Sequence, residues 1–295
     1  MRHNSYSDPR LMSDPIQDLI EKCDGAYSPK TLSCYRRDLI DFRDYCRVEN
    51  LCWFPASDAA VASYIDRMCQ AYVKSTVRRK IGAIRFLHVM NDLDTPTGSA
   101  AVTLAYRRVM RRNRRQPKRA APITPELLEK LLSSCSDDFA GLRDRALMRV
   151  GYESLARAGE IVAIQVEDLH WGDSAARLLI PRSKADIEGR GRWVNLSPKA
   201  AADIRVWTLA SEIRSGALFR RVKGGYLGKS ALDVSSVGRM LRRRQALVGD
   251  CGRKVSGHSF RVGGAQRLLR EGRSDAEIMI SGGWQSYNSM VGYLR

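Results

Sequence analysis

Residues 257–293 have the sequence GHSFRVGGAQRLLREGRSDAEIMISGGWQSYNSMVGY, which combines strong helix signals with side chains able to bind an anion. We expect a helix from Gly257 to Arg270. His258 and Arg261 are three residues apart on it, so they share a face near its N-terminus. An anion there would meet the positive end of the helix, an imidazole and a planar guanidinium together. The segment therefore predicts an anion-binding site.

The second half of this segment predicts two further short helices. Residues 274–277 (Ser-Asp-Ala-Glu) have the capping-box pattern of a helix N-terminus. Glycines at 282 and 283 end that helix, and Trp284 follows them. We expect a final helix that carries Tyr293. A lone tyrosine near a terminus is usually a packing residue, so its position alone assigns it no function.

Two upstream groups complete the set of candidate residues. Arg157 and Glu160 are three residues apart just before the first expected strand, and such a pair is most often a surface ion pair. Lys184 lies in a polar turn between the next two expected strands, which form a hairpin. Each group alone is a weak signal. The expected strands cover residues 161–166, 177–181 and 192–196.

Taken together, these residues resemble the signature of the tyrosine recombinase (integrase) family; they are Arg157, Lys184, His258, Arg261, Trp284 and Tyr293. The 23 residues from Arg261 to Trp284, and the nine from there to Tyr293, match the family spacing. Many relatives carry histidine at the position of Trp284. The resemblance is specific over residues 125–295 and rests on architecture alone over residues 14–112.

The resemblance implies a mainly α fold with two domains. The N-terminal domain would be a helical, SAM-like DNA-binding bundle. The C-terminal domain would be mostly helical and catalytic, with a small antiparallel three-stranded sheet, as in DNA breaking–rejoining enzymes. We expect a loose N-terminus, the bundle, a basic linker and the catalytic domain at residues 1–13, 14–112, 113–124 and 125–295.

The implied activity is site-specific recombination of double-stranded DNA. Tyr293 would attack the scissile phosphate, and the 3′-phosphotyrosyl link would conserve the bond energy for rejoining. The enzyme would work as a tetramer on two recombination sites, through a Holliday junction, with no metal, ATP or other cofactor. Family members continue into a further helix after the tyrosine. With Arg295 ending the sequence, we expect a trimmed chain or another way of linking subunits.

Each remaining residue of the set has a role that suits phosphodiester exchange. Planar guanidinium forks can hold the charge of the phosphorane, which a lysine cannot do as well. A lysine on a turn suits protonation of the leaving 5′-oxygen, and an indole N–H can only donate. The roles are charge stabilisation by Arg157 and Arg261, general acid catalysis by Lys184, donation to the phosphate or help to the tyrosine by His258, phosphate contact or packing by Trp284, and orientation of a neighbouring cation by Glu160.

Three alternatives stay open. Tyr287 is a rival nucleophile, although it lies only three residues after Trp284, which is short for the family spacing. A type IB topoisomerase-like monomer would use similar residues to nick and relax DNA. A DNA-binding regulator would keep the fold without catalysis, and the complete residue set argues against it.

The N-terminal bundle is predicted from helix caps and apolar periodicity. Ser28 and Pro29 suit the N-cap and first position of a helix with apolar residues every three or four positions. Three more helices are expected over residues 57–70, 75–90 and up to residue 112. On the third helix of the four we expect Ile84 and Val89 to face inward.

The charge of the chain also predicts DNA as a partner. The 50 Lys and Arg residues outnumber the 32 Asp and Glu, giving a net charge of +18, which is typical of nucleic-acid-binding chains. Residues 107–119 hold eight basic side chains and no acidic ones. We expect phosphate contacts in this run from Arg107, Arg111, Arg112, Arg114, Arg115, Lys118 and Arg119.

Other protein classes are disfavoured. The sequence has no apolar run of about 18 residues and no signal-peptide core, so we expect a cytoplasmic protein without a membrane partner. Its seven cysteines form no C-x-x-C pair, and its four histidines are well separated. We therefore expect reduced thiols and no metal site.

Overall fold

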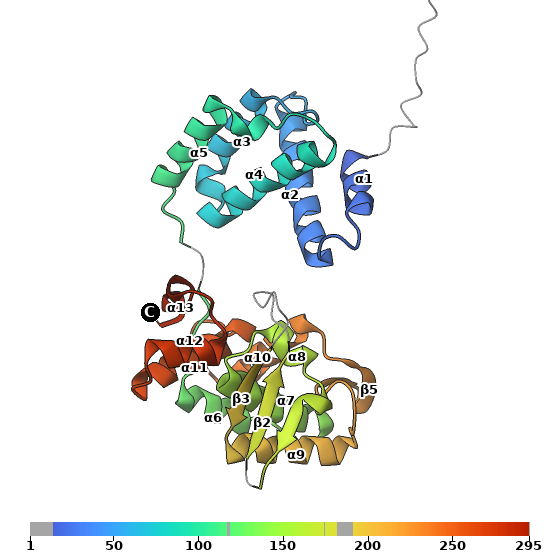
Figure 1. The fold of residues 1–295 in the computed structure, drawn as a ribbon, viewed down its shortest axis with the longest axis vertical. Coiled ribbons are helices and arrows are strands. Elements are labelled where there is room, and N and C mark those ends of the chain that lie inside the picture. The colour runs from blue at the N-terminus through green and yellow to red at the C-terminus, as the bar shows by residue number, and fades with distance from the viewer. Residues whose placement is uncertain (1–13, 117–118, 174, 182–190, 295) are drawn as a thin grey trace, which may run out of the picture. The chain divides into compact units, whose positions relative to one another are not determined.

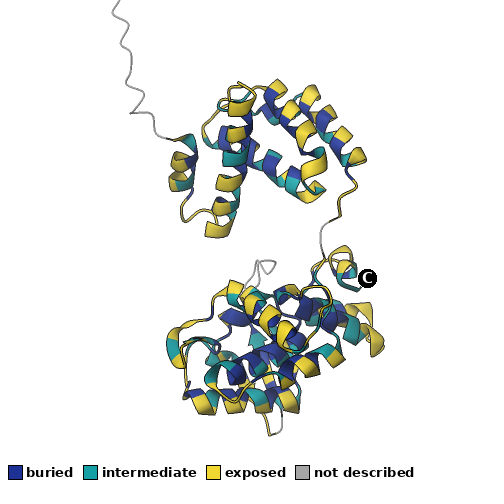
Figure 2. Ribbon diagram, turned by 180° about the vertical axis from the view of Figure 1, so that it is seen from behind, coloured by how far each residue is buried: buried dark blue, intermediate teal, exposed yellow. Residues whose placement is uncertain are grey.

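The structure is a computed structural model that describes residues 14–116, 119–173, 175–181 and 191–294. The chain forms two compact units, Met1–Lys118 and Arg119–Arg295 (Figure 1). Each unit has its own apolar core, and buried residues line the inner faces of its helices (Figure 2).

The first unit is a bundle of helices around one core. Serine side chains at positions 28, 57 and 99 accept backbone N–H groups and so cap three of the helices, as the sequence predicts for the first two. Large side chains such as Phe42 and Ile65 are fully buried between them. The helices are α1 (Pro15–Lys22), α2 (Pro29–Val48), α3 (Asp58–Ala71), α4 (Lys74–Met90) and α5 (Ala100–Arg112), with a 3-10 turn at Pro96–Gly98.

Two expectations for this unit are wrong. Helix α1 was not expected, because its eight residues offer only two buried apolar side chains, Ile16 and Leu19, too few to show a period. Val89 was expected to face inward, but 43% of it is exposed. It lies in the last turn of α4, where Ile84 and Leu87 fill the core instead.

The second unit is mostly helical and contains two small sheets. Its helices are α6 (Pro125–Ser133), α7 (Phe139–Ser154), α8 (Ala158–Ala163), α9 (Pro198–Ser211), α10 (Val234–Leu247), α11 (Gly257–Arg270), α12 (Asp275–Gly282) and α13 (Tyr287–Leu294), with a 3-10 turn at Val166–Asp168. Its strands are β1 (Leu169–Trp171), β2 (Ala176–Ile180), β3 (Arg192–Leu196), β4 (Arg220–Lys223) and β5 (Tyr226–Ala231). The expected mainly α fold with a small antiparallel three-stranded sheet, β1-β2-β3, is confirmed.

The positions of the strands differ in part from those expected. Residues 161–166 were expected to form the first strand, but they begin inside α8, and β1 lies further on. Glu160 starts the helix by accepting the backbone N–H of Arg157 at 3.0 Å, a local signal that outweighs the β-branched residues after it. The hairpin β4–β5 was not expected at all, since helices were expected to fill this part of the chain.

The register of the three-stranded sheet decides which side chains face the interior. Strand β2 pairs with β3 so that Ile180 lies opposite Arg192 and Leu179 opposite Trp193. Because side chains alternate along a strand, Arg192 lies on the same face as the buried Ile180, and Trp193 lies on the outer, exposed face. The sheet therefore directs an arginine inward.

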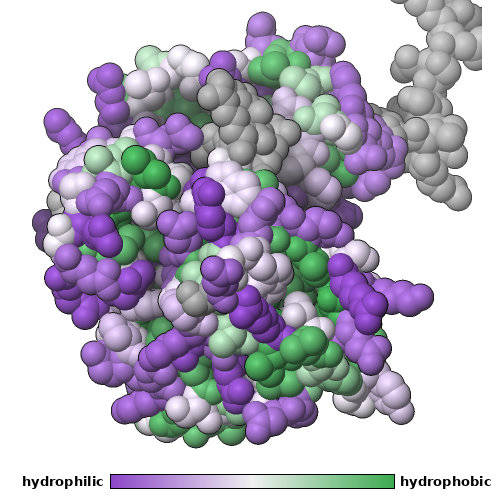
Figure 3. Space-filling model, turned by 60° about the horizontal axis from the view of Figure 1, so that its bottom comes forward, coloured by the Kyte–Doolittle hydropathy of each residue, from purple (hydrophilic) through white to green (hydrophobic). Residues whose placement is uncertain are grey.

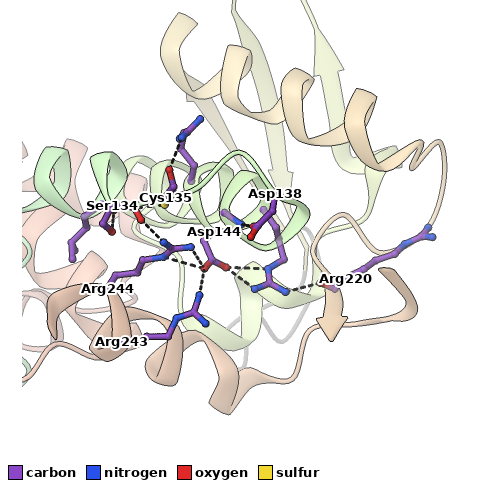
Figure 4. Close-up of polar contacts among 11 residues, drawn as sticks. Ser134, Cys135, Asp138, Asp144, Arg220, Arg243 and Arg244 are labelled. Atoms are coloured by element: carbon purple, nitrogen blue, oxygen red, sulfur yellow. Dashed lines mark hydrogen bonds and ion pairs between the residues drawn. The ribbon is translucent and has the colours of Figure 1, made fainter. Parts of the chain in front are cut away.

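A buried ion cluster joins four parts of the second unit (Figure 4). Asp144 of α7 is fully buried, and its two oxygens accept from Arg143 at 2.6 Å and from Arg244 of α10 at 2.9 Å. Arg244 also donates to the carbonyl of Ser134 after α6, and Arg143 donates to the carbonyl of Arg220 in β4. The cluster thus fixes α6, α7, α10 and β4 relative to one another.

We predict that Asp144→Ala lowers the free energy of unfolding of the second unit by about 3–5 kcal/mol, because it leaves buried arginines without a counter-charge. Urea unfolding of the full chain, followed by tryptophan fluorescence, measures this, since four of the five tryptophans lie in this unit. Arg243→Ala is the control: its side chain is 64% exposed and lies 3.9 Å from Asp144, so it should cost less than about 1 kcal/mol. Equal losses in both variants would contradict the prediction.

Candidate active site

Helices α8, α11 and α13 bring five of the sequence-predicted residues into one region of the second unit. Arg157 is the N-cap of α8 and Glu160 lies in its first turn. His258 and Arg261 lie in the first turns of α11. Helices α11, α12 and α13 pack side by side at one end of the unit (Figure 1). Trp284 lies between the last two of them, and Tyr293 lies on α13; Lys184 is outside the described residues.

Arg261 is the centre of this arrangement. Its side chain is fully buried, and Nη1 donates to the carbonyl of Leu155 at 2.6 Å. Leu155 follows α7 in a left-handed conformation (φ 53°), which ends that helix. Burial and the nearby charge of Arg157 lower the pKa of Arg261 to about 10, so the guanidinium keeps its charge at neutral pH.

Two aromatic rings cover the Arg261 guanidinium. Its Cζ lies 3.9 Å from the centroid of Trp284 and 5.4 Å from that of Tyr293. The two rings contact each other with centroids 5.2 Å apart. Such cation–π contacts favour a charged group that has been removed from water. A small apolar cluster that includes Leu155, Ile278 and Met290 supports the rings.

Glycine is required where Trp284 packs on α12. A Cβ atom on Gly282, the last residue of α12, would lie 1.9 Å from the Trp284 ring. Gly263 on α11 is equally restricted, since its Cβ would lie 1.9 Å from the carbonyl of Ile123. Gly282, predicted as a helix break, thus also allows close packing around the site, as does Gly263 within α11.

Arg157 and Glu160 form an ion pair whose geometry orients the arginine. Glu160 is buried, and its Oε1 lies 2.5 Å from Nη1 of Arg157, while its Oε2 accepts the Arg157 backbone N–H at 3.0 Å. The Arg157 side chain remains 32% exposed. The carboxylate therefore fixes one edge of the guanidinium and leaves part of it accessible.

His258 completes the basic surroundings. Much of the residue is exposed, and partial removal of the imidazole from water, together with the charges of Arg261 and Arg157, lowers its pKa below the usual 6.5. The imidazole is consequently neutral at pH 7, when it can both donate and accept a hydrogen bond.

Several buried donors in this region lack acceptors among the residues that the structure describes. They are Nε and Nη2 of Arg261, Nη2 of Arg192 and Nε1 of Trp284. A buried donor without a partner costs free energy, and most native structures avoid it. The unpaired N–H groups of Arg261 and Trp284, next to several positive charges, are chemically suited to bind a phosphate.

Sequence reasoning missed Arg192, whose guanidinium lies 3.9 Å from Glu160. Arg192, Arg157, Ile280 and Gly283 contribute to the lining of a cavity of about 140 Å³. The available signal was its place in the strand, at an inward position otherwise suited to an apolar residue.

Tyr287, the rival nucleophile, differs clearly from Tyr293. It is the first residue of α13 and is 53% exposed. Within the described part of the chain, the Arg261 guanidinium contacts the rings of Trp284 and Tyr293, and it makes no such contact with Tyr287.

The basic run at the end of α5 is exposed to solvent. Among the described residues, none of its candidate phosphate contacts forms an ion pair; these are Arg107, Arg111, Arg112, Arg114, Arg115 and Arg119, while Lys118 lies outside the described residues. Arg108 in the same run pairs with Asp66 at 2.6 Å. Hydrophilic side chains also cover much of the surface seen in Figure 3.

Within the described ranges, no group of three or more His, Cys, Asp or Glu residues could hold a metal ion. No helix among the described residues is long and apolar enough to span a bilayer.

Comparison with known proteins identifies integrases and recombinases as relatives of this chain. Residues 122–295 match the phage integrase family, and residues 17–90 match the phage integrase N-terminal SAM-like domain. Recombinase cre of Escherichia phage P1 is 29% identical over 273 residues, which cover 85% of this chain and 79% of that protein. An integrase/recombinase xerD homolog of Selenomonas ruminantium is 26% identical and covers 85% of this chain and 80% of its own.

Solved structures share the fold. XerH site-specific recombinase bound to a palindromic difH substrate aligns with a TM-score of 0.70 at 17% identity, over 97% of this chain and 82% of that one. A lambda integrase dimer bound to a COC′ core site aligns with a TM-score of 0.63 at 14% identity, over 95% of this chain and 76% of that one.

We predict that Gly282→Ala destabilises the second unit by about 1–3 kcal/mol, because the added methyl group must displace the Trp284 ring. Gly292→Ala on α13 is the matched control, since nothing lies within 4 Å of its Cβ position. Because Gly292 lies in the last turn of α13, the control should change stability by less than about 1 kcal/mol. Urea unfolding with acrylamide quenching of tryptophan fluorescence compares them; the prediction is wrong if Gly282→Ala leaves both stability and quenching unchanged.

Proposed function

Because the chain belongs to the phage integrase family of tyrosine recombinases, we propose that it cleaves and rejoins DNA at specific sites through a covalent link between Tyr293 and a 3′-phosphate. The observation that carries this proposal is the set of unpaired buried donors of Arg261 and Trp284 beside the Tyr293 ring. These donors suit the non-bridging oxygens of a phosphodiester.

In the proposed cleavage step, the Tyr293 oxygen forms a bond to phosphorus as the bond from phosphorus to the 5′-oxygen breaks. The 5′-oxygen takes a proton and leaves as a hydroxyl, and the 3′-phosphate stays on the tyrosine. Attack by a 5′-hydroxyl from the partner strand reverses the step, so the bond energy is conserved and no ATP, metal or other cofactor is needed.

The other residues divide the remaining tasks. Arg157 and Arg261 stabilise the charge that develops on the non-bridging oxygens. Neutral His258 accepts the tyrosine proton or donates to the phosphate, and Trp284 donates through its indole N–H. Lys184, outside the described residues, protonates the 5′-oxygen.

The described conformation of the site precedes DNA binding in this scheme. Arg261 is fully buried under the rings of Trp284 and Tyr293, so a phosphate has no direct access to its unpaired nitrogens. The Tyr293 ring must leave the guanidinium before the phosphate can replace it. The same movement would free the tyrosine oxygen for attack.

We further propose that four protomers act on two double-stranded DNA sites in the cytoplasm and exchange one pair of strands at a time through a Holliday junction. Residues 14–112 and the basic linker 113–124 would bind DNA together with the catalytic domain 125–295. A type IB topoisomerase-like activity would need a single duplex, so strand transfer between two duplexes distinguishes the two enzymes. A non-catalytic DNA-binding regulator would form no covalent adduct.

We predict that Tyr293→Phe abolishes the covalent adduct with a nicked DNA substrate, because the variant lacks the attacking oxygen. Its affinity for the site should stay within about threefold, since the loss of one hydroxyl hydrogen bond is a small change. The adduct is measured by denaturing gel electrophoresis. Tyr287→Phe is the matched control and should retain the adduct; a reversed pair of results would assign the nucleophile to Tyr287.

We also predict that DNA affinity falls steeply with salt. If the protomer neutralises about six phosphates, log K should fall against log [salt] with a slope near −5. Replacing Arg111, Arg112, Arg114 and Arg115 by alanine should flatten the slope to about −2. A control removes four arginines that are at least partly exposed and already pair with carboxylates, namely Arg43, Arg67, Arg145 and Arg273. Fluorescence anisotropy measures the affinity of both variants for DNA as a function of salt. Equal slopes in the two variants would mean that the basic run makes no phosphate contacts.

A further inference from the structure

Arg192 occupies an unusual position for an arginine. It is the first residue of β3 and lies opposite Ile180, which is buried. Its neighbour Trp193 is on the outer face and 46% exposed, whereas the Arg192 side chain is 16% exposed. The strand thus places a charged side chain on the face that elsewhere carries apolar residues.

The guanidinium of Arg192 contacts two parts of the site. Its Nη1 donates to the carbonyl of Ser281, in the last turn of α12, at 2.6 Å. Its Nη2 lies 3.9 Å from Oε2 of Glu160, the carboxylate that holds Arg157. The stem packs against Gly283, where a Cβ atom would lie 3.2 Å from Cδ and Nε of Arg192.

This burial is costly for stability alone. Desolvation lowers the pKa of Arg192 to about 10, and Nη2 forms no hydrogen bond within the described part of the chain. An apolar residue of similar size at such a position is often neutral or stabilising. A role in stability therefore does not account for the arginine, and its two contacts suggest a functional one.

We propose that Arg192 is a positioning residue for strand cleavage, which connects the Arg157–Glu160 pair to the backbone that leads into Trp284. This inference rests on the proposed recombinase function. Arg192 acts through its neighbours: its charge lies beside the carboxylate that orients Arg157, and its hydrogen bond to Ser281 fixes the end of α12 from which the Trp284 ring reaches Arg261. The two arginine forks and the indole are thereby held at a constant separation.

The test compares Arg192→Gln and Arg192→Lys with the wild-type chain in single-turnover cleavage of a nicked substrate. Loss of an outer residue that orients a metal ligand typically costs about 10–100-fold in activity. Arg192 orients a guanidinium in the same indirect way, so we expect a loss of this order for Arg192→Gln. Lysine keeps the charge without the fork and should lose about 3–10-fold. DNA affinity should change by less than about threefold, because the Arg192 side chain is mostly buried and is not one of the proposed contacts to DNA phosphates.

Arg177→Gln is the matched control. Arg177 lies on β2 of the same sheet but on its outer face, where it stacks on Trp193 at 5.0 Å. Its loss removes the same charge from the same sheet without touching Glu160 or Ser281. Cleavage by this variant should stay within about twofold of the wild-type rate.

A modified substrate separates positioning from structural damage. A methylphosphonate at the scissile position replaces one charged non-bridging oxygen with a methyl group, so it needs less charge stabilisation from Arg157. Because Arg192 acts in part through that arginine, Arg192→Gln should lose several-fold less activity on this substrate than on the phosphodiester. Adding Glu160→Gln to Arg192→Gln should likewise cost little more than either change alone.

The outcomes distinguish this inference from the function on which it rests. If the wild-type chain forms no adduct on any substrate, the proposed function fails. If the wild-type chain cleaves and Arg192→Gln cleaves equally fast, the positioning role is overturned. Equal losses on phosphate and methylphosphonate substrates also overturn it, because a disordered site would lose both reactions alike.

Discussion

Charge balance around one buried carboxylate underlies the rest of the site. Glu160 lies 2.5 Å from Arg157 and 3.9 Å from Arg192, and its charge favours the protonated form of Arg261. Positive groups crowded together repel one another, and a buried anion lowers that cost. The site nevertheless keeps an excess of positive charge, which a bound phosphate would neutralise. The same carboxylate begins α8, so electrostatics and helix geometry are set by a single residue.

The sequence predicted the helix at this site better than the strand that was expected after Glu160. The helix that carries His258 and Arg261 was expected from residues close together in the chain, and α11 confirms it. The strand expected over 161–166 was wrong because a short run of β-branched residues suits a strand or a buried helix equally well. Only the Glu160 cap, which depends on one hydrogen bond, decides between them.

Contacts between residues far apart in the chain could not be predicted from the sequence. Asp144 and Arg244 meet across 100 positions, and Arg192 and Ser281 across 89, with no local pattern that pairs them. The hairpin β4–β5 was also missed, because its four- and six-residue strands are mostly polar and exposed. The cover that Trp284 and Tyr293 form over Arg261 depends on the same kind of long-range packing.

Leu155 has a wider consequence for how such a protein can change. Its carbonyl holds Arg261, and two residues later the main chain reaches Arg157. The separation of the two guanidinium groups therefore depends in part on three residues of backbone at the end of α7. Surfaces such as the basic run at the end of α5 lie far along the chain from this point. Substitutions on those surfaces can consequently accumulate without altering the spacing between the two guanidinium groups.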